Sequence, residues 1–187
     1  EQTYPDSIDK RKISLHRLGT LENGMTPPGG EGEPFRLISC SNMIPLKRIH
    51  LLIAALSKLG KPVEWVHFGD GPLMETLQKQ AKDFLSQTPV QYIFKGHVPN
   101  DEVLQYYRKH HVDGFINVSE TEGVPLSIME ALSFGIPVIA TKVGGTGEIV
   151  FPGLNGILLP KDFKPSQLAD AVREIMAQSD EERNTMC

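Results

Sequence analysis

The chain has 187 residues, of which 40% are hydrophobic and 22% charged, a composition typical of one ordinary globular domain with a real core. A formal net charge of -4 gives no large basic field and argues against nucleic-acid binding. Only two cysteines occur, Cys40 and Cys187, at opposite ends of the chain, which excludes a disulfide framework and a cysteine zinc site and favours a reducing, cytoplasmic compartment. The longest apolar run, Leu51 to Leu56, is far below the roughly 18 residues of a membrane-spanning helix.

Two different segments precede the regular part of the chain. Residues 1–18 are polar and end in a short apolar alternation from Ile13 to Leu18, which predicts an edge strand. Half of residues 19–34 are Gly or Pro, which predicts a loop. The chain begins with Glu1 and has no signal-peptide pattern, so we expect a piece of a longer protein.

Short apolar stretches rich in Val, Ile and Phe then alternate with longer segments of helical periodicity across 35–178, before a tail at 179–187. Predicted strands are Phe35 to Cys40, Val63 to Phe68, Val90 to Phe94, Asp113 to Val118, Pro137 to Ala140 and Gly156 to Leu159. Predicted helices are Leu46 to Leu59, Pro72 to Leu85, Asn100 to His110 with Asn100 as its cap, Leu126 to Phe134 and Ser166 to Ala177. This order predicts an α/β fold with a doubly wound, Rossmann-like parallel sheet, in which ligands lie beyond the carboxyl ends of the strands.

Two cations, Lys47 and Arg48, stand at the start of the first predicted helix. Positive side chains are unfavourable there because the helix dipole is positive at that end. A bound anion would offset this penalty, whereas two solvated residues are the simpler interpretation.

The predicted helix from Leu126 to Phe134 is apolar except for Ser127, Glu130 and Ser133. An ionised Glu130 within this helix must be paired or open onto a polar cleft, because burying it alone is costly. Before the helix, Glu122 and Gly123 precede Pro125, and free backbone N–H groups from Val124 to Ser127 suit a phosphate or a sugar oxygen. Carboxylates beside such amides suit hydroxyl groups, so the stretch predicts a nucleotide-sugar site.

Several motifs are absent. There is no G-x-G-x-x-G fingerprint and no P-loop, which weakens dehydrogenase and NTPase interpretations. There is no D-x-D sequence and no metal-ligand spacing among the six histidines, so we expect no metal and no cofactor.

From about Lys12 to Ala177, the chain resembles the C-terminal, donor-binding half of the family 4 retaining glycosyltransferases of GT-B fold. The resemblance rests on the E-x7-E pattern of Glu122 and Glu130, on the run Gly135-Ile-Pro-Val-Ile-Ala-Thr that follows, and on the Gly144-Gly145 turn. It implies that Glu122 contacts the donor sugar and Glu130 the ribose. It also implies that Gly96, His97 and Val98 border the base, and that Gly123, Val124, Pro125, Leu126 and Ser127 serve the sugar and diphosphate.

The resemblance further implies transfer of a hexose from a nucleoside diphosphate sugar to an acceptor hydroxyl with retention of configuration, in a bacterial surface-glycan pathway. Lys47 would stabilise the leaving diphosphate electrostatically. Asn42 stands where the family commonly has an arginine, and Arg48 is the candidate to supply that charge. The acceptor domain would precede Glu1, so this chain alone should bind donor without turnover, and peripheral membrane association through the other half stays open.

Two alternatives compete with the transferase. A GT-B nucleotide-sugar epimerase would share donor recognition but use the nucleotide-sugar as its own substrate. A non-catalytic α/β binding module would have lost the ligand, although the carboxylates and Lys47 argue against this interpretation.

Overall fold

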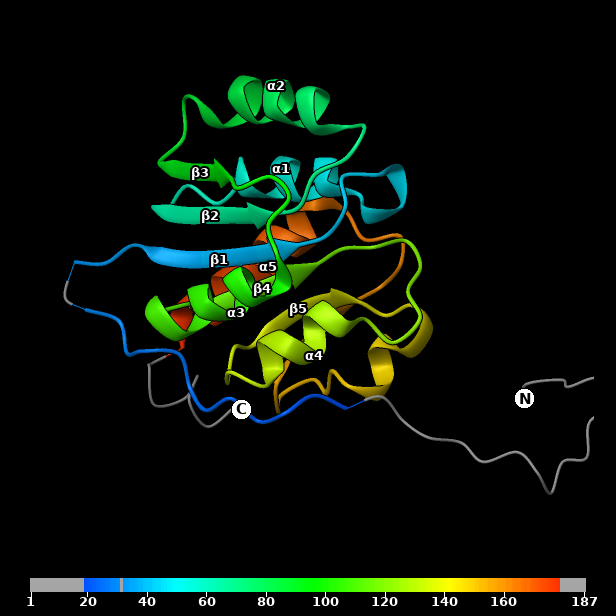
Figure 1. Cartoon of the computed structure of the whole chain (residues 1–187). Coiled ribbons are helices and arrows are strands. Elements are labelled where there is room, and N and C mark those ends of the chain that lie inside the picture. Colours follow the sequence, from blue (N-terminus) through cyan, green and yellow to red (C-terminus); the bar gives the residue numbers. More distant parts are fainter. Residues whose placement is uncertain (1–18, 31, 179–187) are drawn as a thin grey trace, which may run out of the picture.

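Six parallel strands form a single sheet in the computed structural model, which describes residues 19–30 and 32–178 (Figure 1). The strands are β1 (Phe35–Cys40), β2 (Val63–Phe68), β3 (Val90–Phe94), β4 (Gly114–Asn117), β5 (Val138–Thr141) and β6 (Gly156–Leu159). Their order across the sheet is β3-β2-β1-β4-β5-β6, with every neighbouring pair parallel. The predicted doubly wound α/β fold is therefore confirmed, and only β4 and β5 differ at their ends from the predicted ranges.

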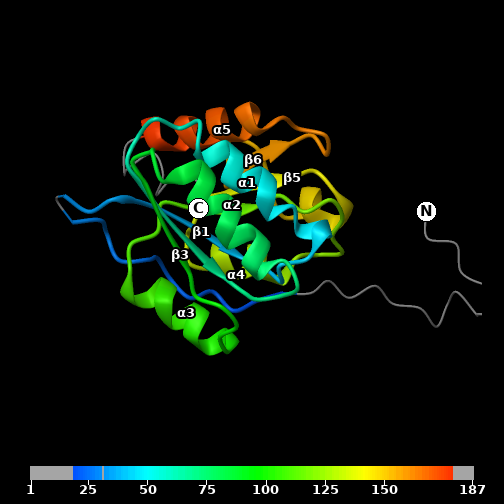
Figure 2. The same ribbon diagram turned by 90° about the horizontal axis from the view of Figure 1, so that it is seen from above.

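Helices cover both faces of the sheet, which explains why its central strands are apolar on both sides. The helices are α1 (Ile49–Leu56), α2 (Met74–Leu85), α3 (Asn100–Lys109), α4 (Leu126–Leu132) and α5 (Pro165–Ala177), with short 3-10 helices η2 (Pro45–Lys47) and η3 (Gly144–Glu148). Helices α1, α2 and α5 pack on one face and α3 and α4 on the other (Figures 1 and 2). The carboxyl ends of the strands lie toward the right of Figure 1, where η2, η3 and the loop before α4 meet.

The predicted single helix from Leu46 to Leu59 is wrong at its start, and it also runs past the observed end of α1 at Leu56. A 3-10 turn ends at Lys47, Arg48 takes a left-handed conformation with φ of 49°, and α1 begins only at Ile49. Left-handed backbone is unfavourable for a residue with a Cβ, so contacts of the Arg48 side chain must hold the break in place.

Asn100 is also not the helix cap that the sequence predicts. The cap position of α3 is Pro99, and Asn100 is the first helical residue. Its side-chain amide instead donates a hydrogen bond of 2.9 Å to Oε1 of Glu130 on α4. Asp101 and Glu102 lie in the first turn of α3 and Arg108 and Lys109 in the last, a distribution of charge that suits the helix dipole.

The Gly/Pro-rich segment contains no helix or strand at 19–30 or 32–34, as predicted. It packs on the end of α4, where the backbone N–H of Asn23 donates to Ser133 O (2.9 Å) and that of Thr26 to Phe134 O (3.0 Å). The predicted edge strand from Ile13 to Leu18 and the tail at 179–187 lie outside the described residues. Within the described residues, no helix is long and apolar enough to cross a membrane.

A buried polar chain ties β1 to β2 beneath the carboxyl edge of the sheet. Trp65 Nε1 donates to Ser39 Oγ (2.9 Å), and that hydroxyl lies 2.8 Å from His67 Nδ1. The other ring nitrogen, His67 Nε2, lies 3.1 Å from the carbonyl oxygen of Ser41. If the imidazole of His67 is neutral with its proton on Nε2, every donor and acceptor in this row of hydrogen bonds has a partner, from Trp65 Nε1 to the carbonyl oxygen of Ser41.

We expect His67 to make stability pH-dependent. Burial lowers its pKa from 6.5 to about 4, against a smaller opposing contribution from the Ser41 carbonyl. Between these two values the unfolded chain binds a proton that the folded chain does not, so the free energy of unfolding falls as the pH is lowered, by up to about 1.4 kcal/mol per pH unit. Urea unfolding at pH 7 and pH 5 measures this slope. In His67→Gln the slope should flatten, whereas in the control His97→Gln, at an exposed histidine, it should persist; equal slopes in wild type and His67→Gln would contradict the assignment.

Candidate functional site

Lys47 and Glu122 meet at the carboxyl edge of the sheet. Lys47 ends η2, and its Nζ lies 2.6 Å from Oε1 of Glu122, which belongs to the loop between β4 and α4. The two residues are 75 positions apart in the chain, and they come together because β1 and β4 are neighbours in the sheet. The ion pair is partly open to solvent, with side-chain exposures of 23% for Lys47 and 11% for Glu122.

Asn117, the last residue of β4, completes this cluster and was not foreseen from the sequence. Its Nδ2 donates to Glu122 Oε1 at 3.1 Å, and its Oδ1 accepts from the backbone N–H of Ser119 at 3.0 Å. Burial by itself raises the pKa of Glu122, but hydrogen bonds from Lys47, Ser119 and Asn117 outweigh it and lower the pKa below its ordinary value. Glu122 is therefore a carboxylate at neutral pH.

Glu130 lies on α4 with only 7% of its surface exposed. The expectation that it is not an ordinary solvated helix residue is confirmed, and Asn100 is its hydrogen-bond partner. Burial raises the pKa of Glu130, and the Asn100 bond opposes this only in part. Glu130 and burial together also raise the pKa of the Cys40 thiol at the end of β1 to about 11, with burial the larger cause.

Two cavities lie beyond the carboxyl ends of β1, β2 and β3. One has a volume of about 490 Å³ and the other about 120 Å³, and both are lined by Asn42 and His97. Val98 lines the smaller one, next to Cys40. Gly96 lies beside them, where its carbonyl accepts a hydrogen bond of 2.8 Å from Gly69. The residues predicted to border the base thus gather with Asn42 at this edge.

The predicted loop of free amides precedes a short helix. Pro125 occupies the cap position of α4, Leu126 begins the helix, and no side chain among the described residues caps it. Val124 and Leu126 are 37% and 51% exposed, and Ser127 is half-buried. Gly123 is exposed, and its carbonyl accepts a hydrogen bond of 2.7 Å from Gly145 in η3. The Gly144-Gly145 turn therefore supports the loop that carries Glu122.

Arg48 takes no part in the ion pair between Lys47 and Glu122, and its hydrogen bonds go to backbone carbonyls instead. Its guanidinium donates to the carbonyls of Val118 (2.7 Å), Lys161 (2.6 Å) and Ser119 (3.1 Å) and lies over the ring of Phe163. Arg48 and Lys47 do not share the single helix that the sequence predicts, because Lys47 ends η2 and Arg48 lies between η2 and α1. These contacts join η2 to the loops after β4 and β6. The Arg48 guanidinium therefore stabilises the arrangement of these loops.

We expect Arg48→Ala to lower the free energy of unfolding by about 2 kcal/mol, because three carbonyls lose a charged donor. Arg48→Lys should also be destabilised, since an ammonium cannot reach all three carbonyls. Urea denaturation measures both changes. A diphosphate role would instead appear as weaker nucleotide binding with stability unchanged.

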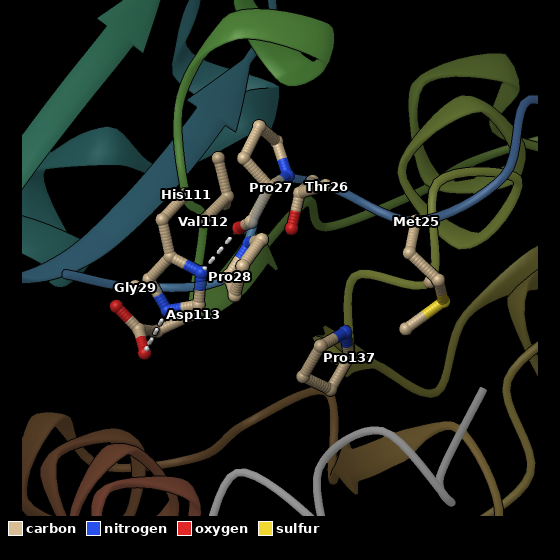
Figure 3. Close-up of a pocket in the computed structure, with 10 residues that line it drawn as sticks. Met25, Thr26, Pro27, Pro28, Gly29, His111, Val112, Asp113 and Pro137 are labelled. Atoms are coloured by element: carbon tan, nitrogen blue, oxygen red, sulfur yellow. Dashed lines mark hydrogen bonds and ion pairs between the residues drawn. The ribbon is translucent and has the colours of Figure 1, made fainter.

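A more enclosed pocket lies at the opposite edge of the sheet, at the amino ends of β4 and β5 (Figure 3). It measures about 370 Å³ and is formed by residues 25–29 together with 111–113, Gly135 and Pro137. Its polar groups are engaged with one another: His111 lies 2.9 Å from the Pro27 carbonyl and 3.0 Å from Asp113 (Figure 3). These bonds fasten the 19–30 segment to the sheet, and none of the predicted site residues lines the pocket. Among the described residues, no three His, Cys, Asp or Glu side chains gather as metal ligands would.

Comparisons with known proteins are consistent across sequence and structure. Residues 27–186 match the family model described as glycosyl transferases group 1. A putative teichuronic acid biosynthesis glycosyltransferase, TuaC of Bacillus subtilis, is 33% identical to this chain. The match spans 67% of this chain and 29% of the length of TuaC. The chain covers 29% to 38% of the length of the first curated relatives that it matches.

Two solved structures have the same fold. The lipopolysaccharide outer core galactosyltransferase WaaB superposes with a TM-score of 0.78 at 22% identity, over 96% of this chain and 52% of its own. Anabaena HepE, in complex with UDP and glucose, gives a TM-score of 0.70 at 25% identity, over 82% of this chain and 41% of its own.

Proposed function

The chain belongs to the glycosyl transferases group 1 family, and on this premise we propose that it is the donor-binding domain of a transferase that moves a hexose from a nucleoside diphosphate sugar to an acceptor hydroxyl. The UDP and glucose bound by HepE support this class of donor. The relation to a teichuronic acid glycosyltransferase supports a place in bacterial surface-glycan synthesis.

The observation that carries the proposal is the pairing of Lys47 with Glu122 at the carboxyl edge of the sheet. Of the two paired side chains, the ammonium of Lys47 can bind a diphosphate, and the carboxylate of Glu122 can accept hydrogen bonds from sugar hydroxyls. In the proposed complex Lys47 contacts the diphosphate, and Glu122 accepts hydrogen bonds from the sugar. The backbone N–H groups of residues 123, 124, 126 and 127 donate to the sugar and diphosphate, whereas Pro125 has no N–H. Glu130 accepts from the ribose, and residues 96–98 border the base beside Asn42.

We propose that transfer proceeds with retention of configuration. In glycosyl transfer, negative charge grows on the diphosphate as its bond to the sugar breaks, and a fixed cation stabilises that charge more in the transition state than in the ground state. Because the guanidinium of Arg48 donates to three carbonyls, Lys47 is the main cation in this role. The proposal includes no metal ion.

In this proposal the site that binds the acceptor substrate belongs to another part of a longer protein, because the chain covers only 29% to 38% of the length of its first curated relatives. We therefore expect these 187 residues to bind donor nucleotide without transferring sugar. Neither the epimerase nor the binding module is favoured, because the matched family and the named relatives are transferases.

Thermal unfolding with millimolar UDP, GDP and ADP tests donor binding. A ligand at about a hundred times its dissociation constant adds roughly 2.7 kcal/mol to the free energy of unfolding. We expect one nucleotide to stabilise the wild type selectively and Glu130→Ala to lose this effect. Absence of stabilisation by every nucleotide would argue against the proposal.

A further inference from the structure

Asn117 is a buried amide at an otherwise apolar strand end. It is 7% exposed and follows Phe115 and Ile116, both fully within the core. A buried side-chain amide costs free energy unless its donor and acceptor are both used. Both are used here, and by two different parts of the same loop.

The two bonds have different purposes. The acceptor, Oδ1, takes the N–H of Ser119 two residues ahead, a local bond that shapes the turn after β4. The donor, Nδ2, reaches Oε1 of Glu122, the same oxygen that Lys47 contacts. Two donors from different elements therefore fix one carboxylate oxygen in direction and position.

We propose that Asn117 is a positioning residue that holds the Glu122 carboxylate ionised and oriented before the donor sugar arrives. The sugar contact itself rests on the proposed function, but the hold on Glu122 does not. A carboxylate fixed in advance loses little conformational freedom on binding, which favours affinity for the group that it contacts.

Two substitutions separate this role from a purely structural one. Asn117→Asp keeps the size and the acceptor for the Ser119 N–H but replaces the donor with a second carboxylate. Asn117→Ser keeps a local acceptor, adds no charge and is too short to reach Glu122. A matched control is Asn155→Asp, because Asn155 also forms two loop bonds, to Phe151 N–H and to Ile149 O, away from Glu122.

The first measurement is the titration of the Glu122 side-chain carboxyl carbon by NMR in glutamate-labelled protein, with Glu130 as an internal reference. Both Asn117 variants should raise the pKa of Glu122, since one loses a donor and the other also adds a like charge. Asn155→Asp should leave it unchanged. A Glu122 titration equal to that of wild type in folded Asn117→Asp and Asn117→Ser would overturn the proposal.

The second measurement compares a nucleotide-sugar with its nucleotide by calorimetry, UDP-glucose with UDP where thermal unfolding selects UDP, and the corresponding pair where it selects GDP or ADP. We expect the Asn117 variants to lose roughly tenfold in affinity for UDP-glucose and little for UDP, because only the sugar depends on Glu122. An equal loss for both ligands would indicate a structural effect and contradict the positioning role. If wild type binds UDP-glucose no more tightly than UDP, the sugar contact of the proposed function fails, and the titration alone decides the role of Asn117.

Discussion

If the chain is the donor-binding domain proposed above, replacement of Lys47 by methionine in the longer protein is expected to lower kcat/KM for sugar transfer by roughly 10²- to 10³-fold, the usual cost of losing one preorganised group that meets growing negative charge. Methionine has nearly the length of lysine but carries no charge. The Nζ of Lys47 is held 2.6 Å from Glu122, so its position is fixed before the donor binds. The loss should fall mainly on kcat, because the charge on the diphosphate grows as the sugar leaves.

Steady-state kinetics with varied donor measure this effect. Lys161→Met is the matched control, since Lys161 is also at the carboxyl edge and lies 3.4 Å from Glu120, but its side chain is 57% exposed. We expect the control to retain wild-type kinetics. Similar losses in the two variants, or none in Lys47→Met, would refute an electrostatic role for Lys47.

Gly144→Ala is expected to lower the free energy of unfolding by about 2–5 kcal/mol, from strained backbone and overpacking together. Gly144 has a φ of +50°, and a Cβ there would lie 1.7 Å from the carbonyl oxygen of Glu122. The backbone at Glu122 would have to move, so donor binding should weaken as well. Gly147→Ala, in the same 3-10 helix, meets nothing within 4 Å and should be tolerated.

Urea denaturation of the two alanine variants gives the difference directly. A large loss of stability for Gly144→Ala with near wild-type behaviour for Gly147→Ala would tie the effect to the contact with Glu122. Equal stabilities would mean that the η3 turn adjusts without moving the loop.

Most of the sheet could be predicted from local sequence, because its strands are short apolar runs bounded by turn residues. Four of the six ranges, including Phe35–Cys40 and Val63–Phe68, agree with the structure at both ends. The break at Arg48 could not be predicted. Neither Gly nor Pro marks it, and its left-handed backbone accompanies carbonyl contacts from residues 118, 119 and 161, which are remote in the sequence.

Some residues of the candidate site could likewise be predicted from local sequence and others could not. Glu122 and Glu130 stand out because carboxylates are unusual in and beside an apolar helix start. Asn117 gives no such signal, since a lone Asn at a strand end is typical of an ordinary turn. Its role depends on Lys47 and Glu122 meeting across β1 and β4, and that proximity is set by the strand order. Local sequence likewise predicts only a helix cap at Asn100, because its contact with Glu130 joins two helices that are apart in the sequence.

The central claim is that donor nucleotide binds at the carboxyl edge of the sheet, and amide chemical-shift mapping with UDP-glucose, or with the sugar of the nucleotide selected by thermal unfolding, tests it most directly. The account predicts amide shifts at Lys47, at residues 96–98, from Glu122 to Val124 and at Leu126 and Ser127, with the strongest perturbations around the Lys47–Glu122 pair. Shifts confined to residues 25–29 and 111–113, around the pocket at the amino ends of β4 and β5, would place the ligand at the wrong edge and contradict the account.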